Sequence, residues 1–231
     1  MIKLRKLSVF LILTYIFAAD VFGQAENPYE KMAPIEAYLM KDRMREIEIA
    51  RSSAHAEITA DATVMVLTKN GYEVAVEGTN GFICLVLRSF TGPWANPEFW
   101  NPKHIDPICY NPAAVRTVLP QDTMRTNLAL KGLSKERMRE EILKAYGLGK
   151  LKAPENGALA FMMSKNQMLG DAIGHWRPHI MLYIPNATYF ELGAIGQFAP
   201  GVPFDGENEI MTTILIPVPH WSDGTPEAGQ P

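Results

Sequence analysis

The chain has 231 residues, of which 47% are hydrophobic, so it can bury a full core, and its formal net charge is −3. Its two cysteines cannot build a structural zinc site without help from histidines. A mildly acidic chain without clustered Lys and Arg is a poor nucleic-acid binder, because neutralising phosphates needs a basic surface. We therefore expect no nucleic-acid partner.

The N-terminus predicts a signal peptide over residues 1–23. A basic head precedes an apolar run from Leu7 to Ala19, a pattern typical of secretory signals. The run is too short to span a bilayer comfortably. Small residues favour cleavage after Gly23, then after Ala25; an uncleaved anchor remains the alternative. Cleavage takes away a net charge of +2, so −3 becomes −5. We expect an exported protein, periplasmic or extracellular, with no stable membrane insertion after cleavage.

Residues 24–60 form a predicted lead-in segment with one helix. Pro34 suits a first helical turn, where its missing N–H is not needed. The helix is expected over 35–51, with an apolar stripe and a charged face that we interpret as solvated. The stripe consists of Ile35, Leu39, Ile47 and Ala50.

Two Asn-Gly pairs, Asn70-Gly71 and Asn80-Gly81, separate β-rich runs. Asn-Gly between such runs is a strong hairpin signal, because both residues tolerate positive φ. We predict a three-stranded meander over 63–68, 72–77 and 82–89. The third strand is apolar on both faces, which predicts an interior position in the sheet.

A Pro/aromatic loop follows, with five prolines between Pro93 and Pro112. Prolines at this density leave little room for helix or strand. The aromatic residues within the loop predict that it packs against the fold, because disordered linkers are poor in aromatics. Two roles remain open, a functional lid and a structural cover.

Residues 113–147 are predicted to be helical. Ser134 is the expected N-cap of the last helix, Leu133 and Met138 occupy hydrophobic-staple positions, and Gly147 ends the helix. Asp122 is the predicted cap of an earlier short helix.

Three more strands are expected at 157–164, 179–185 and 211–219. The fold class is therefore α+β: a mainly antiparallel sheet of about five to six strands with the meander, covered by helices and the Pro/aromatic loop. We expect residues 61–221 to form one domain and residues 222–231 a flexible tail.

Cys84 and Cys109 are predicted to form a disulfide, because an exported chain with an even cysteine count favours one. A bridge across about 24 intervening residues contributes roughly 3 kcal/mol in the chain-entropy model. Two reduced, buried thiols are the alternative.

The run GHWRPHIMLYIP, from Gly174 to Pro185, carries the candidate binding site. Pro178 disfavours a helix before it, and an extended chain puts His175, Arg177 and His179 on one side. Guanidinium and imidazole groups suit a small anionic or carboxylate-bearing ligand better than a metal. The expected aromatic walls are Trp176, Trp94 and Trp100. We expect no metal and no cofactor. The alternative is an ordinary strand start in which Arg177 pairs with a carboxylate.

Two other functions remain open. A hydrolase or lyase would use a histidine as general base, oriented by Asp106, Asp171 or Asp223. A structural or interaction module of the cell envelope would lack a deep site. If 179–185 and 211–219 are antiparallel neighbours, we expect His179 and His220 at opposite ends of the sheet. The sequence predicts no oligomeric state.

Overall fold

The computed structural model describes residues 27–186 and 210–228. The predicted signal peptide lies outside the described residues, so export stays a prediction. Within the described part of the chain, no helix is both long enough and apolar enough to cross a membrane.

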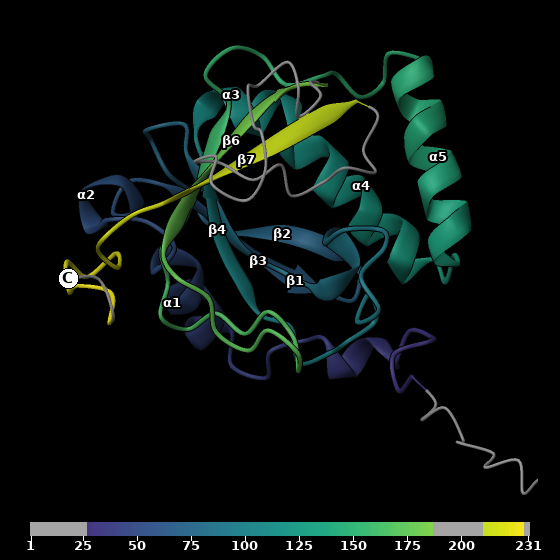
Figure 1. Ribbon diagram of the computed structural model, residues 1–231, viewed down its shortest axis with the longest axis horizontal. Coiled ribbons are helices and arrows are strands. Elements are labelled where there is room, and N and C mark those ends of the chain that lie inside the picture. Colours follow the sequence, from purple (N-terminus) through teal and green to yellow (C-terminus); the bar gives the residue numbers. More distant parts are fainter. Residues whose placement is uncertain (1–26, 187–209, 229–231) are drawn as a thin grey trace, which may run out of the picture.

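The described residues form an α+β fold with one seven-stranded sheet and five α-helices, shown in Figure 1. The strands are β1 (Thr63–Thr68), β2 (Gly71–Val76), β3 (Ile83–Leu87), β4 (Asp106–Tyr110), β5 (Leu159–Met162), β6 (His179–Pro185) and β7 (Met211–Pro217). The helices are α1 (Arg43–Arg51), α2 (Ala56–Thr59), α3 (Pro112–Thr117), α4 (Leu119–Leu130) and α5 (Lys135–Gly147), with short 3-10 turns at Ile35–Ala37 and Ser89–Thr91.

The predicted three-stranded meander was wrong in its second connection. The strand order of the sheet is β2-β1-β3-β4-β5-β6-β7, and β1 pairs with β3 in parallel while every other neighbouring pair is antiparallel. The first Asn-Gly pair does form a hairpin, with Thr68 opposite Gly71. The second does not, because the chain leaves β2 and crosses to the far side of β1. The prediction of five to six strands was also too low. The interior position of β3 is confirmed.

The crossing explains why the second Asn-Gly pair makes no hairpin. Thr79 and Asn80 donate their backbone N–H groups to Asp61 O, which ties the crossing to the start of β1. Gly78 passes so close to that backbone that a Cβ atom there would lie 2.1 Å from Thr63 N. Only glycine fits such an approach. The crossing therefore depends on a contact that no local pattern reveals.

The two faces of the sheet carry different layers. On one face, α1 packs over β1, β3 and β4 around Val64, Val66 and Val86. On the other, α3 and the start of α4 cover Leu85, Ile108 and Tyr183. In Figure 1, α1 lies at the lower left and α4 and α5 at the right.

The predicted disulfide is confirmed. Cys84 and Cys109 are bonded and lie directly opposite each other on β3 and β4, both fully buried on the α1 face. The bridge therefore joins two central strands of the sheet.

β4 lies inside the segment that was expected to exclude strands, so that expectation was wrong. Pro107 is tolerated there because β5 pairs only with Cys109 and Tyr110, leaving the proline with a strand neighbour on one side alone. The rest of the loop packs down, as its aromatic residues predict: Trp94, Phe99 and Trp100 are buried.

The helix expected over 35–51 is broken. Asp42 accepts hydrogen bonds from the Met44 and Arg45 N–H groups, so α1 begins at Arg43. Asp122 is not a cap. It is buried within α4, and its Oδ2 accepts a hydrogen bond from the Tyr110 hydroxyl at 2.5 Å. Helix α5 confirms the Ser134 cap and ends at Gly147.

The charged face of α1 is not fully solvated. Glu46 is 1% exposed, and its Oε1 accepts hydrogen bonds from the Arg88 guanidinium at 2.9 Å and from Leu67 N at 3.2 Å. Arg88 also donates to the carbonyls of Tyr38 and Val86. This ion pair joins α1, β1 and the end of β3.

The first residues of the predicted flexible tail, 222–231, make contacts with the folded domain. Ser222 donates its hydroxyl to Ser52 O at 2.6 Å and its N–H to Met163 O. Trp221, just before it, is buried.

Candidate functional site

In the predicted site run, His175 lies at a bend and β6 begins at His179. His175 and Arg177 are exposed, whereas His179 is 1% exposed at the start of β6. His179 Nδ1 lies 2.9 Å from Arg177 O, and its ring packs edge-on against Trp176 at 4.5 Å. Burial lowers the pKa of His179 below its usual range. The three groups therefore do not converge, and ligand binding by them stays a prediction.

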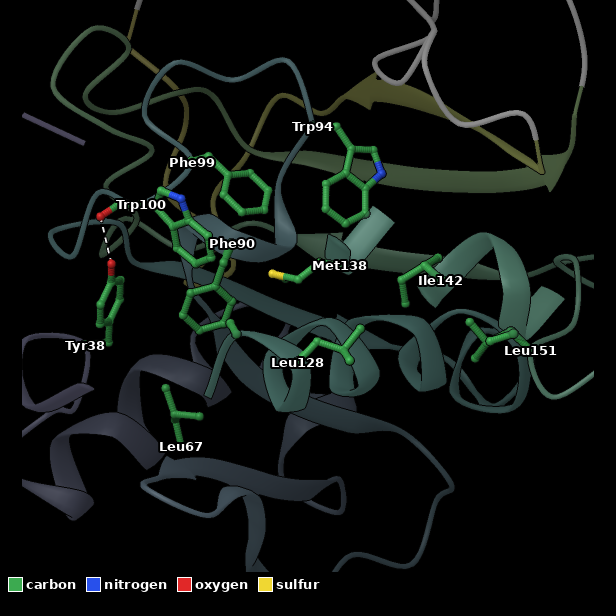
Figure 2. Packing of buried hydrophobic residues seen from close by; sticks show 12 residues of the cluster. Tyr38, Leu67, Phe90, Trp94, Phe99, Trp100, Leu128, Met138, Ile142 and Leu151 are labelled. Atoms are coloured by element: carbon green, nitrogen blue, oxygen red, sulfur yellow. Dashed lines mark hydrogen bonds between the residues drawn. The ribbon is translucent and has the colours of Figure 1, made fainter. Parts of the chain in front are cut away.

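Two of the expected aromatic walls lie elsewhere. Trp94 and Trp100 belong to a buried cluster with Phe90 and Phe99, and Trp94 stacks on Phe99 at 5.6 Å. Figure 2 shows this cluster, in which the Tyr38 hydroxyl donates to the Trp100 carbonyl at 2.8 Å. Neither tryptophan forms a ring contact with Trp176, which packs on His179.

The geometric expectation for His179 and His220 was wrong. β6 and β7 are antiparallel, and this pairing places His179 opposite Pro217, three residues before His220. The two histidines therefore lie at the same end of the sheet. The rings of His175 and Trp221 are in contact at the same end, with their centres 4.9 Å apart.

A groove that the sequence did not predict lies beside the Pro/aromatic loop. Its volume is about 550 Å³, and its walls come from residues 27–32, 96–100 and 132–136. Its lining includes Tyr29, Met32, Phe99 and Trp100, and we call the last two its aromatic floor. Small-molecule sites typically measure about 300–1,000 Å³ and are largely apolar and aromatic.

A hydrogen-bond network holds two of these walls together. Glu98 accepts the N–H groups of Asp171 and Ala172, at 2.6 and 2.8 Å. Asp171 in turn accepts hydrogen bonds from Lys103 and from the Tyr29 hydroxyl. These hydrogen bonds lower the pKa of Asp171. The N-terminal segment is thus fixed against the loop.

The groove lining also includes two lysines, Lys31 and Lys135, and two glutamates, Glu30 and Glu136. None of the ion pairs among the described residues involves Lys31 or Lys135. Lys135 Nζ lies 5.7 Å from the centre of the Phe99 ring. Glu136 faces the same groove, but hydrogen bonds to its own backbone N–H and to Ser134 lower its pKa, so its charge is directed at the start of α5.

The three predicted orienting carboxylates have different partners. Asp171 pairs with Lys103, and Asp223 pairs with Lys165, both at the surface. Asp106 lies beside a histidine: His104 Nε2 is 3.7 Å from its Oδ2. This histidine is neither His175 nor His179. Its i, i+2 spacing before a strand was the signal that could have identified the pair.

No group of three or more metal-ligating side chains gathers among residues 27–186 and 210–228. Comparison with protein-family models, with curated proteins and with solved structures finds no match to this chain.

Proposed function

We propose that the protein binds a small carboxylate-bearing ligand with an aromatic or apolar body in the groove between residues 27–32, 96–100 and 132–136. What supports this most is the pairing of an aromatic floor with lysines that have no carboxylate partner among the described residues. The floor would bury the ligand's body, and Lys135 and Lys31 would bind its carboxylate.

Phenylacetate is a suitable probe, because phenylacetamide matches its shape without the charge. Isothermal titration calorimetry should show saturable binding of phenylacetate and weaker binding of phenylacetamide. Lys135→Gln should weaken phenylacetate binding about tenfold, because a charge-assisted hydrogen bond contributes roughly 1.5–3 kcal/mol.

Two control variants decide where the ligand sits. Lys150→Gln removes an exposed lysine outside the groove and should leave affinity unchanged. Arg177→Gln should also leave it unchanged. If Arg177→Gln abolishes binding while Lys135→Gln does not, the ligand binds the 175–179 run and the groove assignment is wrong. Equal binding of phenylacetamide would contradict the role of the lysines.

A second candidate function, catalysis by a histidine base, is favoured by the His104–Asp106 pair. In a hydrolase, His104 would take a proton from water as the water oxygen attacks the ester carbonyl carbon, and it would return the proton to the leaving oxygen as the ester C–O bond breaks. Hydrolysis of p-nitrophenyl acetate should then be faster with the native protein than with His104→Gln, and unchanged in His175→Gln. Equal rates in all three proteins would rule this function out.

A further inference from the structure

A second, smaller cavity lies between the sheet and α4. Its volume is about 80 Å³. β4 contributes Asp106 and Tyr110, β6 contributes Tyr183, and α4 contributes Asp122 and Arg125. The cavity is separate from the groove, with which it shares no lining residue.

Asp106 is the unusual member of this lining. Its Oδ1 is buried and has no hydrogen-bond partner, and its Oδ2 comes no closer than 3.7 Å to His104 Nε2. His104 Nδ1 is likewise buried without a partner. Nearly all buried polar atoms in proteins are hydrogen-bonded, so an exception indicates a bound water, ion or ligand group. The Asp106 side chain is 15% exposed, so it lies at the rim of the cavity.

Gln167 adds a second acceptor near Asp106. The bridge between Ile105 and Met168 is antiparallel, so Asp106 and Gln167 are neighbours across it. Gln167 Oε1 is also buried without a partner, while its Nε2 donates to Trp176 O at 2.7 Å. Gln167 does not line the cavity, so the unpartnered acceptor there is Asp106, which favours a ligand that donates hydrogen bonds.

The charged side chains among the described residues that line the cavity have a negative net formal charge. Asp122 accepts a hydrogen bond from the Tyr110 hydroxyl. Burial, together with the Asp122 charge, keeps the pKa of Tyr110 well above its usual range. Arg125 donates to the carbonyls of Phe90 and Gly92, and its guanidinium lies 3.9 Å from the centre of the Trp94 ring. Among the described residues that line the cavity, there are two carboxylates and one guanidinium. An anion would be repelled from Asp106, and a cationic donor would be attracted.

We propose that Asp106 binds the ammonium group of a small primary amine at the rim of this cavity. An ammonium group has three donors and no acceptor, which suits the Asp106 carboxylate oxygen that has no donor. A cavity of about 80 Å³ admits the head of such a ligand, not a large body. This site is independent of the carboxylate groove.

Methylammonium chloride is the direct probe, with sodium chloride at equal ionic strength and tetramethylammonium chloride, which lacks N–H donors, as references. In the native protein, methylammonium should shift the backbone amide resonances of Asp106 and Ile108 saturably, and the references should not. Sodium acetate should shift neither. If methylammonium gives no saturable shift, or acetate shifts these resonances instead, the proposal is overturned.

A pair of variants then assigns the binding group. Asp106→Asn keeps the shape of the side chain and should weaken methylammonium binding at least about tenfold, because it removes a charge-assisted hydrogen bond. Asp223→Asn removes a surface carboxylate that lines neither the cavity nor the groove, and it should bind as the native protein does. Equal affinity in Asp106→Asn and the native protein would refute the role of Asp106. Phenylacetate titration of the same variants separates this site from the groove, where both should bind normally.

Discussion

Two carboxylates, one on each face of the sheet, have very different hydrogen-bond partners. Glu46, on the α1 face, accepts hydrogen bonds from the Arg88 guanidinium and from Leu67 N. Asp106, on the α4 face, has an oxygen that accepts none from the described residues. Glu46 is closed off at 1% exposure, whereas Asp106 lines a cavity.

This difference in hydrogen bonding indicates that the charge of Glu46 is structural, whereas the charge of Asp106 is available for binding. A carboxylate with all its donors supplied by the chain contributes to one fixed arrangement of elements. A carboxylate whose donors are missing costs free energy that a ligand can recover. The α1 face is therefore the structural side of this sheet, and the α4 face is the side where we place ligand chemistry.

The largest expected loss of stability comes from breaking the Glu46–Arg88 ion pair on the α1 face. Glu46→Gln removes the only charged partner of Arg88 seen among the described residues, leaving a guanidinium that is 1% exposed. We expect the free energy of unfolding to fall by about 3–5 kcal/mol. Urea denaturation followed by circular dichroism measures it. The matched control is Glu48→Gln, whose ion pair with Arg45 is exposed; a loss there as large as in Glu46→Gln would contradict this account.

The next effect tests the crossing that brings β3 beside β1. In Gly78→Ala, the new methyl group meets the backbone of Ala62 and Thr63, which must move. Overpacking of this kind costs about 1–3 kcal/mol, or more. Gly147→Ala is the control, because a Cβ atom there has open space. Thermal unfolding of both variants should show a lower Tm for the first alone.

A smaller effect should appear as pH falls. Burial lowers the pKa of His179, so below its usual value of about 6.5 the unfolded state takes up a proton that the folded state resists. The free energy of unfolding should therefore decrease from near-neutral pH toward the folded pKa. His179→Gln should flatten this slope in urea titrations at several pH values. An unchanged slope would show that His179 does not carry this dependence.

The parts of the fold that follow from short patterns were predictable. The Asn70-Gly71 hairpin, the strand at 179–185 and the Ser134 cap each depend on neighbouring residues. The disulfide followed from a cysteine count in a chain with a predicted export signal. The parallel β1–β3 pair did not follow, because the crossing depends on Gly78 meeting a backbone far from it in sequence.

The candidate sites were predictable only in part. The 175–179 run was predicted to be extended, but His175 lies at a bend, and burial separates His179 from the exposed His175 and Arg177. The groove joins three segments that are distant in the chain, so no spacing predicts it. Arg88, directly after an apolar strand, was a usable signal, since a charge in that position often needs a buried partner.

The most direct test of the contrast between the two faces is a paired urea denaturation of Glu46→Gln and Asp106→Asn. Both changes replace a carboxylate with an amide of the same shape. We predict a loss of about 3–5 kcal/mol for the first variant and a change within about 1 kcal/mol for the second, because only the first breaks a completed ion pair. Equal losses in the two variants would contradict the account.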